Sequence, residues 1–503
     1  MTRFTKRTTF STLLLCTSIL AGCSTTGTSS TSHKNTNNTF QATEQFYDSI
    51  VAKDDVDIAK LNLFMTKMPK GGDIHHHYSG TIYAETYLDW VENKNWRIDS
   101  CTLTIVKDDK PSGKGCAALT VAELLAEDAL FRKLLTLWSD KDYDNHYHDQ
   151  PPPDSNFFNT FGYFGPIADE YADIGVQIIK QRALKENVTY IETMYSRVAA
   201  KAKNFYSASE RAELIQALRN VKTQEQANAL FDKISQTLSS KAGFNQAVSD
   251  FVNDVANIHQ NIDDDNFTMR YQTYTARVQD PLQVFTELYS GFIASNQSPL
   301  IVGVNIVAPE NNYVALMDYT LHMQMYNYLH HKFPKVNRAL HAGELTLGMV
   351  RPKDLMFHIK EARDIAKAER IGHGIDLPYE THSLELLEDL KQNAAIEINL
   401  TSNEFILGVE GQEHPYLIYS AYGVPMVIST DDSGVSRNNL TNEFVLLASR
   451  YQPSYSKIKE YVYNSIRYSF MSEADKATNL KRLDEKFEDF EAEMAKLASK
   501  MTN

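Results

Sequence analysis

Eight short β-rich, apolar runs recur along this chain of 503 residues, and helical patterns follow most of them. Parallel strands need a long crossover, usually a helix, so repeated strand-helix alternation is typical of a (β/α)8 barrel. We therefore predict an α/β protein with a TIM barrel. Its strands are expected at residues 72–77, 188–193, 267–275, 300–307, 337–342, 369–373, 394–400 and 424–430.

Two departures from regular alternation predict additions to the barrel. More than 100 residues separate the first two predicted strands, which favours an inserted subdomain at about residues 89–150, ending before the turn-forming Pro151-Pro152-Pro153. Residues 457–470 and 473–500 have helical patterns and are expected to pack outside the barrel. No low-complexity break or repeat follows residue 45, so residues 46–503 are predicted to form one domain.

The N-terminus has the pattern of an export signal. Arg3, Lys6 and Arg7 precede an uncharged stretch, residues 8–20, that is too short to span a bilayer. The following Leu-Ala-Gly-Cys resembles a bacterial lipobox, which predicts a signal peptide at residues 1–22 and a lipid on Cys23. An ordinary secretory signal with a chance cysteine is the alternative. The Ser/Thr/Asn-rich residues that follow, up to residue 45, are predicted to be a flexible tether.

This start predicts a lipid-anchored protein of the cell envelope. Ser24 after the lipobox cysteine favours the outer membrane or the periplasmic face, by resemblance to Gram-negative lipoproteins. In an oxidising compartment Cys101 and Cys116 could form a disulfide, although two free thiols remain an alternative.

Net charge bears on the class of partner. Removal of residues 1–22 would take away three basic and no acidic residues, so the formal charge would change from −14 to −17. Nucleic-acid binding needs clustered Lys and Arg, and no such cluster is evident. A small uncharged substrate is therefore expected, and oligomeric state is not predicted.

Metal-capable residues stand at the ends of several predicted strands. His75 and His77 are two residues apart, so in a strand they point the same way and could hold one ion. His341 and Asp431 each end another apolar run, and three imidazoles with one carboxylate and a water would make a catalytic zinc site. Taken singly, the three consecutive histidines could lie in a solvated loop, His341 could be a core histidine and Asp431 a helix cap.

Two further groups could move protons. Glu344 follows His341 by three residues, and His373 lies between two glycines in Ile-Gly-His-Gly. Outside this context the glutamate could be a surface or capping group, and the histidine could serve only a tight turn. Beside a metal site the pair suits a hydrolase, in which one group donates a proton and the other orients or deprotonates a water.

The motifs together resemble those of the adenosine deaminase family of metal-dependent hydrolases. The resemblance spans roughly residues 65–475 and rests on four motifs in the family's order. These are Met68-Pro69-Lys70 with Ile74-His75-His76-His77, His341-Ala342-Gly343-Glu344, Ile371-Gly372-His373-Gly374 and Ser429-Thr430-Asp431-Asp432. The segment after the first strand, with its cysteine pair, is more similar to the secreted adenosine deaminase-related growth factor branch than to compact cytosolic enzymes.

The resemblance implies a role for each motif residue. One Zn²⁺ per chain would be bound by His75, His77, His341 and Asp431. His373 would orient the metal's water and help take its proton or stabilise the developing charge, and a protonated Glu344 would donate to purine N1. Asp432 would hydrogen-bond N7, the backbone N–H of Ala308 would reach N3, and Ser79 would lie near the ribose 5′-hydroxyl.

Several positions depart from the family pattern on the sugar side. Ser79 replaces an acidic residue, Ala308 a glycine, Met194 a basic residue and Ser433 a proline. The expected reaction is the deamination of adenosine to inosine and ammonia outside the cytoplasm, with 2′-deoxyadenosine as a second candidate substrate. Alternatives are a related aminohydrolase acting on adenine, a nucleotide or another amino-heterocycle, and a non-catalytic surface binding lipoprotein.

Overall fold

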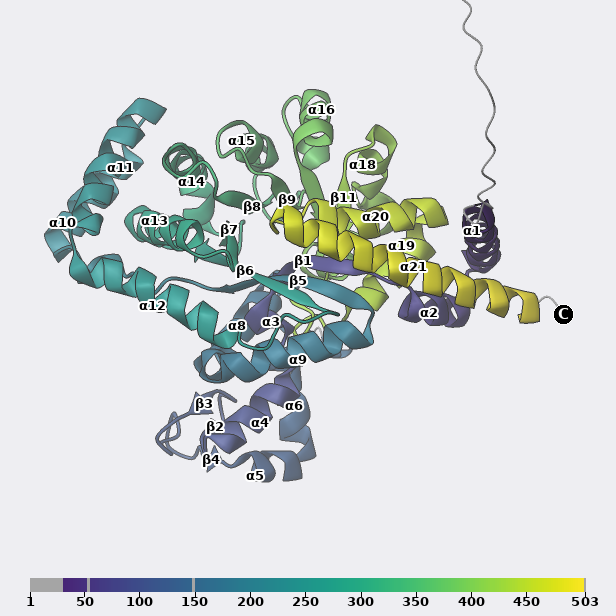
Figure 1. Cartoon of the computed structure of the whole chain (residues 1–503). Coiled ribbons are helices and arrows are strands. Elements are labelled where there is room, and N and C mark those ends of the chain that lie inside the picture. The colour runs from purple at the N-terminus through teal and green to yellow at the C-terminus, as the bar shows by residue number, and fades with distance from the viewer. Residues whose placement is uncertain (1–29, 52–54, 147–149, 502–503) are drawn as a thin grey trace, which may run out of the picture.

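Eight parallel strands form the central sheet of the protein, in the order β1-β5-β6-β7-β8-β9-β10-β11 (Figure 1). The computed structural model describes residues 30–51, 55–146 and 150–501. The strands are β1 (Gly71–His77), β5 (Val188–Ser196), β6 (Thr268–Ala276), β7 (Ile301–Val307), β8 (Asn337–Ala342), β9 (Arg370–His373), β10 (Ala395–Ile398) and β11 (Met426–Ile428). Each corresponds to a predicted strand, so the prediction of a (β/α)8 barrel is confirmed.

The sheet closes on itself at the carboxyl ends of its first and last strands. The Asp431 backbone N–H donates to the His75 carbonyl at 2.9 Å, and the His77 N–H donates to the Asp431 carbonyl at 3.3 Å. These bonds form a parallel bridge between β1 and the segment that follows β11. Active sites of such barrels lie at this end of the strands.

Helices cover the outside of the barrel, which leaves the strands buried on both faces. Strands in this position read as nearly continuous apolar runs, and β9, β10 and β11 have no exposed residue. Helices that precede or follow the strands of the barrel include α9 (Ala172–Lys185), α13 (Pro281–Gln297), α14 (Tyr313–Lys332), α15 (His358–Asp364), α16 (Ser383–Asn393), α17 (Leu400–Leu407), α18 (Tyr416–Tyr422) and α19 (Leu440–Tyr451).

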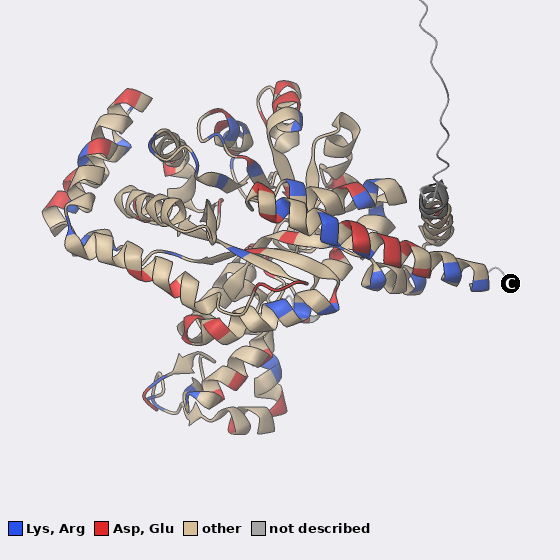
Figure 2. Ribbon diagram, in the orientation of Figure 1, with Lys and Arg blue, Asp and Glu red and all other residues tan. Residues whose placement is uncertain are grey.

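The last two helices lie outside the barrel, as predicted. Helix α20 (Tyr455–Arg467) packs on β1 and β11 through Ile458, Val462 and Ile466, which share one face at helical spacing. Helix α21 (Glu473–Met501) packs on α20, and Figure 2 shows acidic and basic residues along its length. Among the described residues no helix is both long and apolar enough to cross a bilayer.

The N-terminal part of the described chain corrects one prediction. The predicted tether extends to residue 45, but helix α1 (Ser30–Val51) begins inside it and packs against α21. Phe40 contacts Tyr455 (ring centroids 5.4 Å apart), and the Thr43 hydroxyl donates to the Glu491 carbonyl at 3.2 Å. These contacts order a segment whose composition alone predicts a coil. The predicted signal peptide, Cys23 and the start of the tether lie outside the described residues.

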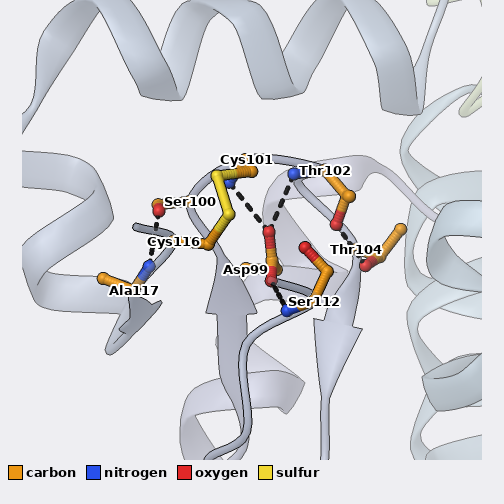
Figure 3. The surroundings of a disulfide bond; sticks show 8 residues. All are labelled: Asp99, Ser100, Cys101, Thr102, Thr104, Ser112, Cys116 and Ala117. Carbon is orange, nitrogen blue, oxygen red and sulfur yellow. Dashed lines mark hydrogen bonds between the residues drawn. A yellow bond between two sulfur atoms is a disulfide. The ribbon is translucent and has the colours of Figure 1, made fainter. Parts of the chain in front are cut away.

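The connection between β1 and β5 holds a small antiparallel sheet beside the barrel (Figure 1). Its strand order is β3-β2-β4, and Cys101 and Cys116 form a disulfide next to it (Figure 3). The Asp99 carboxylate accepts backbone N–H groups from Cys101, Thr102 and Ser112 in the same loop. Helix α2 (Ile58–Lys67) precedes β1. The helices and strands of the connection after β1 are α3 (Tyr78–Thr81), α4 (Ala84–Asn93), β2 (Arg97–Asp99), β3 (Ile105–Val106), β4 (Ala118–Leu119), α5 (Val121–Ala126), α6 (Asp128–Trp138), α7 (Tyr143–His146) and α8 (Pro153–Ala168).

A third departure from regular alternation lies between β5 and β6. Three helices occupy this connection and pack against α13 and α14 on the outside of the barrel (Figure 1). They are α10 (Ala208–Arg219), α11 (Gln224–Ser239) and α12 (Ala242–Ile258). The sequence analysis did not predict this addition, because a run of amphipathic helices resembles a long crossover when only periodicity is read.

The disulfide is expected to stabilise the segment around it. Closing a loop of 15 residues restricts the unfolded chain and contributes about 3 kcal/mol. Replacing both Cys101 and Cys116 by Ser should make residues 97–119 more susceptible to limited proteolysis, and adding reductant to the wild type should have the same effect. Reductant should not change the double variant. Equal cleavage of reduced and oxidised wild-type protein would contradict the expectation.

Candidate active site

Four predicted metal ligands meet at the closure of the barrel. His75 and His77 come from β1, His341 from β8, and Asp431 from the segment after β11. One ligand atom from each lies within 4.8 Å of the others. His77 Nε2 is 3.2 Å from both His341 Nε2 and Asp431 Oδ1, and His75 Nε2 is 3.5 Å from the same oxygen.

These distances suit a divalent cation. Ligand bonds of about 2.0–2.1 Å in a tetrahedral site place neighbouring ligand atoms about 3.3 Å apart. The ring nitrogen His75 Nε2 is buried and has no hydrogen-bond partner among the described residues. A buried polar atom without a partner needs an explanation, and a metal ion between the four side chains supplies one. The donor set therefore fits the metal that the sequence predicts.

Hydrogen bonds behind two of the histidines hold their metal-facing nitrogens free. His75 Nδ1 lies 2.6 Å from Glu397 Oε2, and His341 Nδ1 lies 2.9 Å from Asn305 Oδ1. A proton on each Nδ1 leaves Nε2 unprotonated, as metal binding requires. Neither Glu397 nor Asn305 was predicted from the sequence. Their signal is weak, because each is a single polar residue inside an apolar strand.

An arginine compensates the buried charge of Glu397. Arg370 donates from Nε to Glu397 Oε1 and from Nη2 to Glu192 Oε1, each at 2.6 Å, and all three side chains are buried. Burial alone would raise the pKa of Glu397, but Arg370 and His75 together hold it below its usual value. The ionised carboxylate behind His75 is thus maintained inside the barrel.

Glu344 and His373 stand next to the ligand cluster. His373 Nε2 is 3.6 Å from Glu344 Oε1 and 3.9 Å from Asp431 Oδ2. The Asn403 side-chain amide donates to His373 Nδ1 at 2.9 Å, an assignment that follows the hydrogen-bond network and puts the ring proton on Nε2. That proton points toward the carboxylates, so His373 can donate a hydrogen bond to a group bound there.

The pKa of Glu344 is raised to about 8, first by burial and then by the nearby Asp431 and Glu310 carboxylates. At neutral pH the side chain is therefore largely protonated and can donate a hydrogen bond. This is the property that the predicted proton donor needs.

A buried ion-pair cluster supports the loop that carries Glu344. Glu310 accepts the backbone N–H groups of Gly343 and Glu344 at 3.1 and 2.9 Å. The same carboxylate lies 2.6 Å from His358 Nδ1 and 3.4 Å from Arg277 Nη1. Arg277 also donates to the His341 carbonyl at 3.1 Å, so one cluster positions both a metal ligand and the acid. The sequence analysis assigned none of these supporting roles.

The predicted substrate contacts share a cavity with the ligand cluster. Asp432, Ala308 and Ser79 line a cavity of about 330 Å³, together with His77, His341, Glu344, His373 and Asp431. This volume lies in the usual range for small-molecule sites. Asp432 Oδ1 is buried without a hydrogen-bond partner in the described chain, and burial and Asp431 raise the pKa of Asp432. A protonated Asp432 can donate to a ligand.

Three residues that line this cavity have an unfavourable backbone conformation. Ala308, His373 and Asp431 have positive φ values of 80°, 68° and 60°, which side chains other than glycine rarely adopt. Each such residue costs about 1–3 kcal/mol and persists where surrounding packing imposes it, often in active sites. At Ala308 the conformation is one that glycine would adopt without strain.

Two glycines allow close approach to site residues. A Cβ on Gly80 would lie 1.5 Å from Asp432 Oδ1, and a Cβ on Gly372 would lie 2.6 Å from His75 Cε1. Both positions must therefore lack a side chain for Asp432 and His75 to hold their places.

One wall of the cavity was not predicted. It includes Phe157, Phe158 and Phe161 of α8, with Met194, Tyr274 and Val278 from the carboxyl side of β5 and β6. The spacing Phe-Phe-x-x-Phe is helical, but helical spacing more often marks a core face than a ligand site. Only the tertiary structure brings α8 to the mouth of the barrel.

Replacing Glu397 by Gln should weaken metal binding while leaving the four ligands in place. The glutamine amide oxygen is uncharged, so it accepts the His75 Nδ1–H hydrogen bond more weakly than the carboxylate does. Loss of such a charged hydrogen-bond partner typically lowers metal affinity by about 10–100-fold. Competition of zinc-loaded protein with a chromophoric chelator measures the change. Glu385→Gln, on the exposed face of α16, is the matched control. An unchanged zinc affinity in Glu397→Gln would argue against the ligand assignment of His75.

Known proteins resemble this chain in both sequence and fold. The family model described as Adenosine deaminase matches residues 233–486, just over half of the chain. An adenosine deaminase of Clostridium kluyveri is 34% identical over 142 residues, covering 28% of this chain and 38% of that protein. One from Enterococcus faecalis is 33% identical over 151 residues, covering 30% and 41%. The chain therefore matches only about two-fifths of the length of these curated relatives.

Solved structures share the architecture at low sequence identity. Arabidopsis ADAL complexed with GMP superimposes with a TM-score of 0.53 at 16% identity, covering 84% of this chain and 98% of that one. An amidohydrolase from Burkholderia ambifaria with bound Zn gives 0.52 at 14% identity, covering 88% and 96%. These likenesses concern the fold. Because the family model spans half of the sequence and the site geometry agrees with it, the chain belongs to the adenosine deaminase family.

Proposed function

We propose that this protein is a zinc-dependent deaminase that converts adenosine, and also 2′-deoxyadenosine, to inosine and ammonia. The observation that carries the proposal is the buried Glu344 carboxyl group beside four converging ligand side chains. An acid and a metal site in one cavity suit the addition of water to a carbon whose ring nitrogen must gain a proton. One Zn²⁺ per chain would be held by His75, His77, His341 and Asp431.

The chemistry divides between the metal and the side chains around it. Zn²⁺ held by these residues would supply a water whose pKa is lowered toward about 7, and so a nucleophile available at neutral pH. Glu344 donates its proton to N1 of the purine as C6 is attacked. His373 orients the attacking water and stabilises the charge that develops on it. Ser402 donates to Asp431 Oδ2 at 2.7 Å and so keeps that carboxylate in position.

The purine is held by groups on either side of the reacting carbon. A protonated Asp432 donates to N7, and the Ala308 backbone N–H donates to N3. The hydroxyl group added at C6 then gives up its proton as the C6 amino group gains one, the C6–N bond breaks, and ammonia leaves the 6-oxo product. Asp432, Ala308, Glu344 and His373 all line the same cavity.

Glu344→Gln should abolish most of the turnover while zinc remains bound. The amide has no acidic proton to transfer to N1, and a positioned acid contributes about 10²–10⁴-fold to rate. Ammonia release from adenosine and the zinc content of the purified protein are the two measurements. Glu488→Gln, an exposed position on α21, is the control. A turnover number within tenfold of the wild type would refute the assignment of Glu344 as proton donor.

We infer further that the protein is a lipoprotein of the cell envelope. The support is the sequence before the barrel, namely a basic start, a short apolar stretch and Leu20-Ala21-Gly22-Cys23. The disulfide between Cys101 and Cys116 suits an oxidising compartment. The disulfide-bearing segment after β1 also favours the adenosine deaminase-related growth factor branch of the family.

Cys23→Ser should prevent lipid attachment and release the protein from the membrane fraction. Metabolic labelling with a fatty-acid probe and fractionation of the cells measure the two effects. Cys16→Ser, inside the predicted signal peptide, is the matched control and should label like the wild type. If Cys23→Ser still carries the label, the lipobox interpretation is wrong.

A further inference from the structure

The wall of the active-site cavity formed by α8 is apolar. Phe157, Phe158 and Phe161 line the cavity. Their rings contact one another, with centroids 5.2 Å apart for Phe157 and Phe158 and 6.0 Å apart for Phe157 and Phe161. Phe157 is 2% exposed. Packed aromatic rings of this kind favour an apolar ligand group, because polar groups lose hydration there without gaining partners.

Two residues from strand ends extend the apolar wall. Met194 lies on β5, near its carboxyl end, and is 1% exposed; Val278 follows β6. Away from the metal ligands, the polar residues that line the cavity are Ser79, Tyr274 and Asn312. All three are uncharged hydrogen-bonding side chains, which suit sugar hydroxyls better than ionic groups.

No lysine or arginine is among the described residues that line this cavity. Arg197 lies three residues beyond Met194, but it lines a separate cavity and pairs with Glu287 (Nη1 to Oε1, 3.5 Å). Arg182 donates to the Thr81 carbonyl at 2.6 Å and also to Ser433. A 5′-phosphate in the active-site cavity would therefore find no lysine or arginine side chain to pair with.

The orientation of the purine determines what faces this wall. With N1 at Glu344, N7 at Asp432 and C6 at the ligand cluster, N9 lies on the side of the ring system away from C6. A sugar on N9 consequently extends away from the metal ligands. The cavity surface left for the sugar and its 5′ substituent is the apolar wall with its few uncharged polar groups.

We infer that the preferred substrate is an uncharged purine nucleoside with an apolar group at the sugar 5′ position, such as a 5′-alkylthio nucleoside. This inference rests on the deaminase function proposed above and narrows its substrate. The reaction itself is unchanged: water adds at C6, the C–N bond to the amino group breaks, and ammonia leaves. The 5′ group takes no part in the chemistry and contributes only binding to the wall.

Ammonia release from three probes tests the preference, with the mature, zinc-loaded protein. The probes are adenosine, 5′-deoxy-5′-(methylthio)adenosine and adenosine 5′-monophosphate. Filling an apolar pocket with one more small group changes kcat/KM by roughly 10–200-fold, so the methylthio nucleoside should exceed adenosine by about tenfold or more. The nucleotide should fall about 100-fold or more below adenosine, because its phosphate would be desolvated without a counter-charge.

A pair of variants on α8 tests whether the phenylalanines make this contact. Phe161→Ala should lower the ratio of kcat/KM for the methylthio nucleoside to kcat/KM for adenosine by about tenfold. Tyr163 lies on the same helix but does not line the cavity, so Tyr163→Ala should leave the ratio unchanged. If the ring instead stacks on the purine base, Phe161→Ala lowers both substrates equally, and that result overturns the inference.

The outcomes separate this inference from the proposed function. Ammonia from none of the three probes would contradict deaminase activity itself. Deamination of adenosine with an equal or lower kcat/KM for the methylthio nucleoside would overturn only the preference for an apolar 5′ group. A kcat/KM for the nucleotide within tenfold of that for adenosine would likewise overturn it, because a cationic contact would then have to reach the cavity.

Discussion

The bridge between β1 and the segment after β11 is the contact on which the site depends. Two backbone hydrogen bonds join His75 and His77 to Asp431, across more than 350 residues of sequence. They close the barrel and, in the same step, put two imidazoles next to a carboxylate. The third imidazole, His341, reaches them because its strand ends at the same rim. The contact that closes the barrel therefore also brings the metal ligands together.

The barrel interior tolerates the charges behind this site because each is paired. Arg370 joins Glu192 and Glu397, and Arg277 joins Glu310. Removing one partner of a buried pair leaves an uncompensated charge and is usually more costly than the pair's net contribution. The two arginine clusters thus serve mainly to hold His75 and the Glu344 loop in one arrangement. The positive φ angles at His373 and Asp431 indicate that this arrangement is imposed on the backbone.

The proposed chemistry and the proposed selectivity depend on different parts of the chain. The ligands, the acid and His373 lie on the strand ends or in the short segments that follow them. Phe157, Phe158 and Phe161 come instead from α8, in the long connection after β1. This division is expected for a barrel, in which a rigid frame carries the reacting groups and variable connections shape the rest of the pocket. Changes in the connection could alter the substrate without disturbing the metal site.

Local sequence was sufficient for the strands and for the candidate ligands. Buried parallel strands must be apolar and short, so all eight were visible as runs, and His75, His77, His341 and Asp431 stood out because polar residues end those runs. The same reasoning failed for residues 30–45, where a polar composition predicts a coil but Phe40 and Thr43 pack onto the C-terminal helices. The helices α10–α12 were likewise not predicted, since periodicity does not say where a helix packs.

What the amino-acid sequence determined by itself was the alternation of strands and helices, the residues able to bind a metal and move a proton, and the expectation of an exported protein. The tertiary structure alone decided which polar residues support those groups and which side chains complete the cavity. Glu397, Glu310 and the phenylalanines of α8 acquire their roles through contacts between segments far apart in the chain. Such contacts depend on packing in three dimensions, and neither periodicity nor composition records them.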